Sequence, residues 1–325
     1  MNNIYKIRPY FNISNDHLNK IKNIERKLEL IEDVSSDIEI KCRARAIHSS
    51  LAIESNPLSL EDVEMIMYDR IVFGDEEDIK EVKNINELYR RIERFNWRDE
   101  EDFIGAYVLM MEYFCDNNFY RDHGEGIIND GKIIYMAPNS LVVPSLMRSL
   151  FDFIRDNEGI IHSIILSSLF HYYFVYIHPF SDGNGRMARF WMHLMLFDWN
   201  SKFKNIPIEE EIFLNQEKYY DVINECHNNG NANKFIDFML DVIDNVLEKL
   251  PRKTTQKISD IQVRIVDFLR NNPMASRGSI AVYINDITED GIKYHLKALQ
   301  DKGIIKRIGP DKGGYWKVLS ENKDQ

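Results

Sequence analysis

Residues 170–189 read FHYYFVYIHPFSDGNGRMAR, an apolar helical stretch that leads directly into a glycine-rich loop. Apolar residues extend back from this stretch, and the pattern predicts one long helix from Gly159 to Ile177. A second helix is predicted from about Gly185 to Asp198. We expect the first of these helices to be the central core helix of its domain.

The loop between the two helices has the components of a phosphate-binding site. Gly183, Asn184 and Gly185 allow backbone N–H groups to turn toward an anion at the N-terminus of a helix, whose dipole also favours negative charge. Arg186 and Arg189 are three residues apart, so they lie on one helix face and can reach a polyphosphate. The loop therefore predicts phosphate ester chemistry.

Two other side chains of the loop can take part in that chemistry. Asp182 offers a hard oxygen ligand, suited to one Mg²⁺ ion that keeps several waters. His178 can accept a proton near neutral pH. Taken singly, each has an ordinary structural explanation, such as a helix-capping histidine or a common turn. Their combination within twelve residues is what favours a catalytic site.

HPFSDGNGRMAR matches the signature of the Fic family, HxFx(D/E)GNGRxxR, at every specified position, and FHYYFVYIHPF resembles the helix that usually precedes it. Members of this family typically transfer AMP from ATP to a Ser, Thr or Tyr hydroxyl of a protein. Members that transfer phosphate instead carry lysine at the second loop glycine, which here is Gly185. The resemblance therefore favours AMP transfer.

The resemblance also assigns roles along the loop. It implies that His178 is the general base on the target hydroxyl, that Asp182 binds Mg²⁺ and that Phe180 packs into the core. The remaining specified residues would bind ATP, with an anion hole formed by Gly183, Asn184 and Gly185 and with the distal phosphates held by Arg186 and Arg189.

The region from Gly126 to Val143 predicts a β-hairpin, because Asn129-Asp130-Gly131 lies between two short β-prone runs. By the resemblance, this hairpin is a flap beside the active site that pairs with the backbone of the target peptide, as an exposed strand edge can. The expected flap residues are Lys132, Ile133, Ile134, Tyr135 and Met136. A purely structural hairpin is the alternative.

Tyr219 and Tyr220 resemble the tyrosine pair that lies near the adenine in family members. The small residues and Gly-Asp pair that usually follow are replaced here by a segment that begins at His227.

A helical stretch at about residues 37–56 ends in Ser50-Leu-Ala-Ile-Glu54-Ser-Asn56. This resembles the inhibitory motif (S/T)xxxE(G/N) of Fic proteins, in which the glutamate reaches the second signature arginine and prevents productive binding of the ATP γ-phosphate. Ser55 departs from the motif, and Asn56 comes one position late. The resemblance implies that Glu54 pairs with Arg189 and that the enzyme is inhibited at rest. An ordinary helix-end carboxylate is the alternative, and in some relatives this glutamate positions a water that removes AMP.

The chain has 325 residues and a net charge of −11, which argues against a general polyanion binder over the whole surface. Residues 251–325 differ, with 14 basic and 9 acidic residues. A polar stretch at the change of charge indicates a domain boundary. We expect an N-terminal helical region at 1–100, a catalytic core at 101–250, a linker at 251–258 and a separate domain at 259–325.

This last domain resembles a winged helix, with three helical or apolar stretches followed by two strands around a glycine-rich turn. Cations that could face phosphates on its third helix and wing are Lys293, Lys297, Lys302, Lys306, Arg307 and Lys312. Glu289 and Asp290 at the start of that helix would repel phosphates. Contacts with DNA, contacts with protein and formation of a homodimer all stay open.

Taken together, the sequence predicts a mainly α fold, a Fic-type helical bundle with a hairpin flap followed by a small winged helix-turn-helix domain. Three cysteines without close spacing argue against a disulfide framework or a zinc site. The N-terminus lacks the pattern of a signal peptide, so we expect a cytoplasmic protein with no membrane contact.

The leading hypothesis is a self-inhibited protein adenylyltransferase that uses ATP and Mg²⁺, with a target that could be the protein itself. The alternatives are a DNA-binding regulator whose Fic domain senses nucleotide, and a hydrolase that removes AMP.

Overall fold

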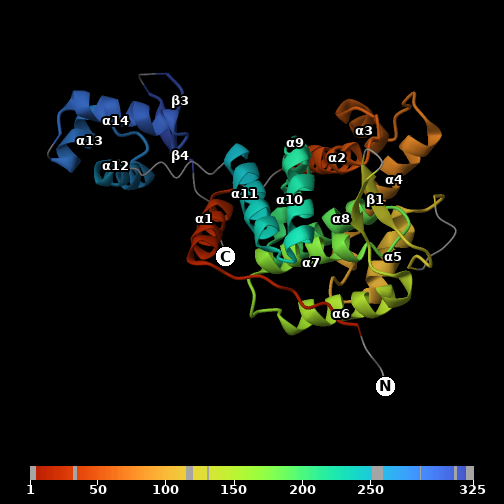
Figure 1. The fold of residues 1–325 in the computed structure, drawn as a ribbon. Coiled ribbons are helices and arrows are strands. Elements are labelled where there is room, and N and C mark those ends of the chain that lie inside the picture. The colour runs from red at the N-terminus through yellow and green to blue at the C-terminus, as the bar shows by residue number, and fades with distance from the viewer. Residues whose placement is uncertain are drawn as a thin grey trace. The chain divides into compact units, whose positions relative to one another are not determined.

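The computed structural model describes residues 5–31, 35–114, 120–129, 132–250, 259–285, 287–310 and 313–319, with only the backbone described at 127–129 and 132–134. The chain forms two compact units, Met1–Pro251 and Arg252–Gln325 (Figure 1). The linker expected at 251–258 lies outside the described residues.

The first unit is mainly helical, as the sequence predicts, and its helices share one hydrophobic core. The helices are α1 (Asn15–Leu30), α2 (Ser36–Ile53), α3 (Leu60–Met67), α4 (Glu76–Arg90), α5 (Glu100–Met110), α6 (Val143–Asp156), α7 (Ser163–Ile177), α8 (Asn184–Trp199), α9 (Ile208–Leu214), α10 (Gln216–Asn229) and α11 (Asn233–Lys249). Three short 3₁₀ turns at Ile92–Arg94, Ser140–Val142 and Ser201–Asn205 connect some of them.

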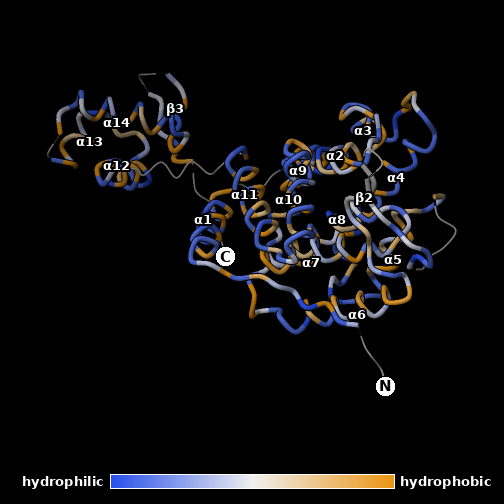
Figure 2. The backbone as a smooth tube through the Cα atoms, viewed as in Figure 1, coloured by the Kyte–Doolittle hydropathy of each residue, from blue (hydrophilic) through white to orange (hydrophobic). Residues whose placement is uncertain are grey.

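Helices α7 and α8 form the centre of this unit, and both are buried along most of their length (Figure 1). Figure 2 shows hydrophobic residues around both of them, as expected for helices that are covered on all sides. The central helix begins at Ser163 rather than at the predicted Gly159, because the His162 side chain accepts a hydrogen bond from the Ile164 N–H and caps the helix there.

Two helices of the first unit were not predicted. Helix α5 begins after Asp99, whose side chain accepts a hydrogen bond from the Glu101 N–H, so the acidic run at 99–102 was a start signal in the sequence. Helix α9 has 7 residues, too few to show a helical period.

The helices before residue 100 pack onto the rest of the unit through polar as well as apolar contacts. Helix α1 lies against α11, where Lys27 pairs with Asp244 at 2.6 Å and with Glu248 at 2.5 Å. Helix α2 packs mainly against α9, and Arg45 of α2 forms an ion pair with Glu210 of α9. Helices α1 and α2 are therefore built into the first unit.

The hairpin consists of two antiparallel strands, β1 (Gly126–Asn129) and β2 (Lys132–Met136), which confirms the predicted strand pair. A register shift between Ile127 and Ile128 interrupts the ladder. The expected turn residues Asp130 and Gly131 lie outside the described part of the chain.

The second unit contains α12 (Asp260–Asn271), α13 (Arg277–Ile284), α14 (Glu289–Asp301) and the antiparallel strands β3 (Ile305–Ile308) and β4 (Tyr315–Val318). Ile265, Ile280 and Ile292 contribute one residue from each helix to its separate core. The strand β4 is tied to the end of α12, because the Trp316 N–H donates to the Pro273 carbonyl at 2.7 Å.

Among the described residues, none of the helices is both long and apolar enough to cross a membrane. Cys42 and Cys226 are free and buried, and Cys115 lies outside the described residues.

Phe103 of α5 provides a test of this core. Its ring contacts Phe151, Phe170, Phe174, Phe180 and Trp191, and it is fully buried. We expect Phe103→Ala to lower the free energy of unfolding by about 3–5 kcal/mol, measured by urea denaturation with circular dichroism. Phe73→Ala is the matched control, because that side chain is 96% exposed, and it should change the value by less than about 0.5 kcal/mol. Equal effects of the two substitutions would contradict the packing described here.

Candidate functional site

The signature loop joins α7 to α8 through two residues in the left-handed backbone region. His178 ends α7 with φ 49° and Gly183 precedes α8 with φ 79°. A Cβ atom at Gly183 would also lie 2.9 Å from the Met110 side chain and 2.9 Å from that of Met111. This position therefore requires glycine for both backbone conformation and space.

Asn184 is turned into the loop and fixes its shape. Its side-chain amide donates to the Phe180 carbonyl at 2.7 Å, and its oxygen accepts from the Phe180 N–H at 3.0 Å. The Phe180 ring is fully buried and stacks on Tyr107, with the ring centroids 3.5 Å apart. The packing of Phe180 in the core agrees with the expectation for this residue.

Arg121, which the sequence analysis did not single out, connects the loop to the base of the hairpin. Its guanidinium donates to the carbonyls of His178 at 2.7 Å, His123 at 2.6 Å and Pro138 at 2.5 Å. The backbone N–H of Arg121 donates to the Pro179 carbonyl at 2.8 Å. Because all of these acceptors are backbone carbonyls, and all but that of His123 are distant in sequence, no local motif pointed to this arginine.

His178 is partly buried at the start of the loop. Burial lowers the pKa of its imidazole, and the positive charge of Arg121 lowers it further, while Glu125 and Glu54 act in the opposite direction. A lowered pKa keeps the ring neutral near pH 7, the form that can accept a proton.

Arg189 of α8 forms an ion pair and hydrogen bonds with the end of α2. Its Nη2 donates to Glu54 Oε1 at 2.7 Å and to the Ser50 carbonyl at 2.9 Å, and its Nε donates to Ser50 Oγ at 2.9 Å. The Arg189 side chain is 1% exposed and that of Glu54 is 31% exposed. The two sequence-predicted inhibitory residues therefore contact the predicted phosphate-binding arginine.

The Glu54 carboxylate lies directly over the N-terminus of α8. A Cβ atom at Gly185 would be 2.2 Å from Glu54 Oε1 and 3.1 Å from Arg189 Nη1. Among the described residues, Arg189 Nη1 has no hydrogen-bond partner although it is buried. The helix N-terminus and the arginine, both favourable for an anion, thus face an internal carboxylate.

Ser55, the residue that departs from the inhibitory motif, has φ 72°. Gly and Asn are the residues that adopt this left-handed conformation most readily, which explains physically why they are usual at this position. The backbone of this chain adopts the same turn with a serine.

Arg186 pairs with two carboxylates. Its Nη2 donates to Asp182 Oδ2 at 2.8 Å, and its Nη1 forms an ion pair with Glu81 of α4. The Asn56 amide in turn donates to Glu81 Oε2 at 2.9 Å. Glu81 was missed by sequence reasoning, because it lies 105 positions from Arg186 and in no motif. The late Asn56 of the motif thus contacts the carboxylate that holds the first arginine.

The predicted adenine-binding tyrosines occupy different environments. Tyr219 lies in the core, and its hydroxyl is 2.8 Å from His171 Nε2. Tyr220 is 40% exposed, and its hydroxyl lies 3.5 Å from the Ile53 carbonyl at the end of α2.

His227, the residue that departs from the family pattern, stacks on Tyr135 with the ring centroids 4.1 Å apart. Its Nδ1 is 3.2 Å from the Tyr172 hydroxyl. Burial and the nearby His178 lower the pKa of His227 to about 4, so its ring is neutral at physiological pH.

Strand β2 carries the five expected flap residues and pairs on one side with β1. Within the described part of the chain, no strand pairs with the other edge of β2. The Tyr135 hydroxyl donates to the Tyr176 carbonyl of α7, and Met136 is 60% exposed. The side chains of Lys132, Ile133 and Ile134 lie outside the described part of the structure.

The basic residues predicted in the second unit are divided among several positions. Lys293, Lys297 and Arg307 line one hollow. The ammonium group of Lys302 lies 3.3 Å from Gln262 Oε1, and Lys306 is exposed on β3. Lys312 lies outside the described residues.

A sequence model of the Fic/DOC family matches residues 75–196, which include the loop, α4 and α8. This region of the chain is therefore similar to the Fic/DOC family. The match begins before residue 101, where the catalytic core was expected to start.

Similarity to known proteins extends beyond this domain. The protein adenylyltransferase Fic of Nematostella vectensis is 36% identical over 101 residues, which are 31% of this chain and 22% of that protein. A probable protein adenylyltransferase of Aquifex aeolicus is 27% identical and covers 54% of this chain and 52% of its own length. The chain thus spans about half or less of the length of these relatives.

Among solved structures, a Fic family protein from Desulfovibrio desulfuricans G20 is similar over 98% of this chain and 100% of its own, with a TM-score of 0.72 and 26% identity. The mainly helical fold predicted from the signature is therefore confirmed.

The opposite pKa directions of two histidines test the electrostatics of the site. We expect His178 to titrate below 6.5, because burial disfavours its charged form, and exposed His123 above 6.5, because Asp122 and Glu125 accept its hydrogen bonds. Both midpoints can be measured from the imidazole signals in an NMR titration of the full chain. Glu125→Gln should lower both midpoints, since the carboxylate raises both pKa values. A His178 midpoint above 6.5 would contradict the burial described here.

Proposed function

We propose that this protein is an adenylyltransferase that transfers AMP from ATP to a hydroxyl of a target protein and that is inhibited by its own Glu54. The observation that carries the proposal is the contact of Glu54 with Arg189 over the N-terminus of α8, beside His178. The names of the curated relatives, which are protein adenylyltransferases, support the same activity.

In the proposed reaction, neutral His178 accepts the proton of the target hydroxyl, and the hydroxyl oxygen attacks the α-phosphorus of ATP. The bond between the α-phosphorus and the bridging oxygen breaks, and pyrophosphate leaves. The N-terminus of α8, with Gly183 and Gly185, binds phosphate oxygens, and Arg186 and Arg189 bind the distal phosphates. Tyr220, on the exposed side of the tyrosine pair, is the residue of the two that can contact the adenine.

A magnesium ion fits the side chains of this site. Asp182 is 69% exposed at the start of α8 and offers a carboxylate to the same region as the arginines. Among the described residues, no group of three or more Asp, Glu, His or Cys side chains is arranged to hold a metal ion, so an ion here would be held by Asp182 together with phosphate oxygens and water. Such an ion would neutralise charge on the phosphates when bound.

The proposed inhibition is a competition between two anions for the same cation. Glu54 neutralises Arg189 and occupies the space above Gly185, so the γ-phosphate cannot bind there at the same time. Glu81 and Asp182 similarly neutralise Arg186. The inhibited state is therefore favoured by carboxylates from α2, α4 and the loop.

The target segment is proposed to bind as an extended strand along the free edge of β2. This mode uses backbone hydrogen bonds and little side-chain specificity, so it is compatible with several target sequences, including a second copy of this chain.

Transfer of label from ATP tests the activity. We expect ATP labelled at the α-phosphate to label protein in the Glu54→Gln background, and His178→Ala in that background to reduce labelling about 100-fold or more, since the general base is lost. ATP labelled at the γ-phosphate is the control, and it should leave protein unlabelled. Transfer of the γ-label, or full activity without His178, would refute the proposal.

Removal of the Glu54 charge tests the inhibition. Glu54→Gln should raise the rate of AMP transfer about tenfold or more, because it frees Arg189 for the γ-phosphate. Glu61→Gln, which makes the same change at an exposed position of α3, should leave the rate within about twofold. The rates are compared as initial rates of labelling, and equal rates for the two variants would rule out inhibition by the charge of Glu54.

A further inference from the structure

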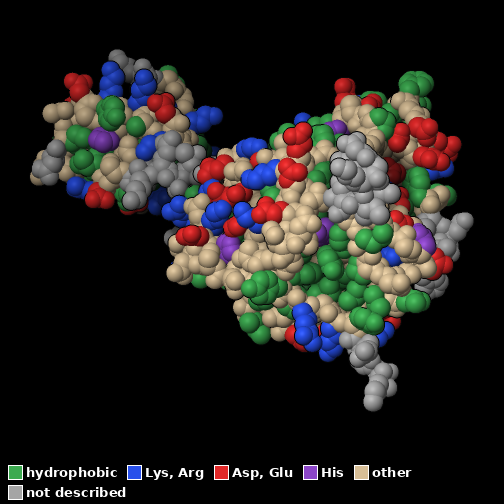
Figure 3. All heavy atoms as spheres, viewed as in Figure 1, with side chains coloured by type: hydrophobic (Ala, Val, Ile, Leu, Met, Phe, Trp, Pro, Cys, Tyr) green, Lys and Arg blue, Asp and Glu red, His purple; other side chains and the backbone are tan. Residues whose placement is uncertain are grey.

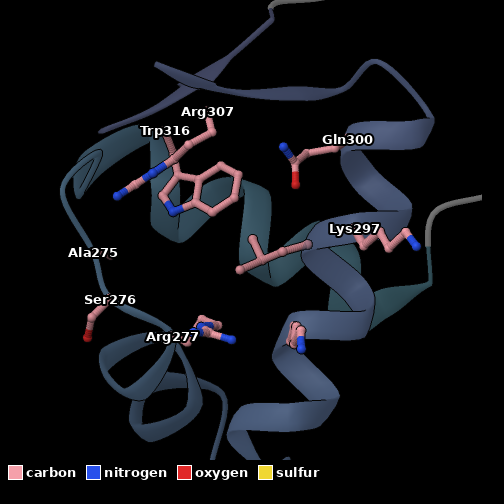
Figure 4. A pocket seen from close by; sticks show the side chains of 9 residues that line it. Ala275, Ser276, Arg277, Lys297, Gln300, Arg307 and Trp316 are labelled. Carbon is pink, nitrogen blue, oxygen red and sulfur yellow. The ribbon is translucent and has the colours of Figure 1, made fainter. Parts of the chain in front are cut away.

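The second unit contains a hollow of about 630 Å³ that the proposed activity does not use (Figure 4). It lies between the start of α13, one face of α14 and the paired strands β3 and β4. Its size falls within the range of small-molecule sites in proteins. Figure 4 shows Trp316, Arg307 and Gln300 on one side of it and Ser276 and Arg277 across from them.

Four cations from three elements line this hollow. Arg277 is the first residue of α13, Lys293 and Lys297 are one turn apart on α14, and Arg307 lies on β3. Arg277 extends toward α14 (Figure 4). Of the described residues that line the hollow, none is acidic. So many like charges around one space favour an anion between them.

The nearby acidic groups lie outside this lining. The Glu289 carboxylate lies close to Gly278. A Cβ atom added at Gly278 would be 2.9 Å from Glu289 Oε1. Glu289 and Asp290 occupy the first turn of α14. A DNA backbone along the N-terminal end of α14 would meet these two carboxylates, whereas a ligand inside the hollow would meet only the cations and uncharged groups.

The uncharged part of the lining suits a planar group beside the charged one. Leu296 and the Trp316 ring provide apolar surface, and Gln300 provides an amide with both a donor and an acceptor. The Arg307 guanidinium lies 5.0 Å from the centre of the Trp316 ring, so the arginine and the aromatic surface belong to one cluster.

We propose that this hollow binds a small phosphorylated molecule of the nucleoside polyphosphate class, with two or more phosphates among the four cations and a planar ring toward Leu296, Trp316 and Gln300. Such a ligand makes the second unit a nucleotide-binding module separate from the catalytic loop. The four cations together carry more charge than a single phosphate, so we expect the ligand to have at least two phosphates.

Trp316 allows binding at this hollow to be observed separately from binding at the Fic domain. The chain has 4 tryptophans, so full-length protein labelled with 5-fluorotryptophan gives four ¹⁹F signals, and Trp316→Phe identifies the signal of the hollow. We expect GTP to shift this signal saturably and pyrophosphate to shift it at higher concentration. Arg277→Gln and Lys293→Gln should each raise the dissociation constant about tenfold, since each removes a charge-assisted contact.

Lys306→Gln is the matched control, because Lys306 is exposed on β3 and does not line the hollow, and it should change the dissociation constant by less than about twofold. The proposal is overturned if GTP leaves the Trp316 signal unchanged or if the three substitutions have equal effects. It is also overturned if 20-base-pair duplex DNA shifts the Trp316 signal at a lower total phosphate concentration than GTP does. In that case the cations would bind a nucleic acid. Equal affinities for GTP and pyrophosphate would exclude the ring contact.

Discussion

The buried guanidinium of Arg189 is the constraint on which the site depends. It is fully buried in the centre of the first unit, and a buried charge without partners is very costly. Helix α2 supplies those partners, with two hydrogen bonds to Ser50 and the carboxylate of Glu54. The position of α2 against α8 and the electrostatics of the loop are therefore linked. If the end of α2 moves away, Arg189 loses Glu54 and becomes available to another anion.

Local sequence was sufficient to predict the parts of the site that lie within one motif. The glycines at 183 and 185 and the arginines at 186 and 189 each occupy a position that the loop signature defines, and Glu54 occupies the glutamate position of the second motif. The contact of Glu54 with Arg189 was also predicted, although the two residues are 135 positions apart, because a second motif marked its partner.

Residues that act through long-range contacts without a motif could not be predicted. Among the described residues, the hydrogen bonds of the Arg121 guanidinium all go to backbone carbonyls, and Glu81 lies on an ordinary amphipathic helix, so neither residue type nor spacing distinguishes them. The limits of α7 were misjudged because apolar Ile160 and Ile161 continue the hydrophobic pattern before the His162 cap. The sequence around α13 predicted a short apolar stretch and no definite helix, because a helix of 8 residues is too short to show a clear helical period.

The two units differ in charge. Asp and Glu side chains are concentrated near the connection of α3 and α4, whereas Lys and Arg side chains are visible over the α14 and β3 part of the second unit (Figure 3). The net charge of −11 is the sum of these separate distributions. General attraction to polyanions is weak on an acidic protein, so local groups of cations, rather than the surface as a whole, favour anions here.

The left-handed serine at position 55 affects how readily the end of α2 can change conformation. A residue other than glycine in this region costs about 1–2 kcal/mol, which the contacts of Glu54 and Asn56 on either side must offset. Two backbone hydrogen bonds, from the Ser55 N–H to the Ala52 carbonyl and from the Asn56 N–H to the Leu51 carbonyl, also support this turn. The left-handed serine thus lowers the net stability of the end of α2, so displacing Glu54 from Arg189 takes less free energy than it would with glycine at this position.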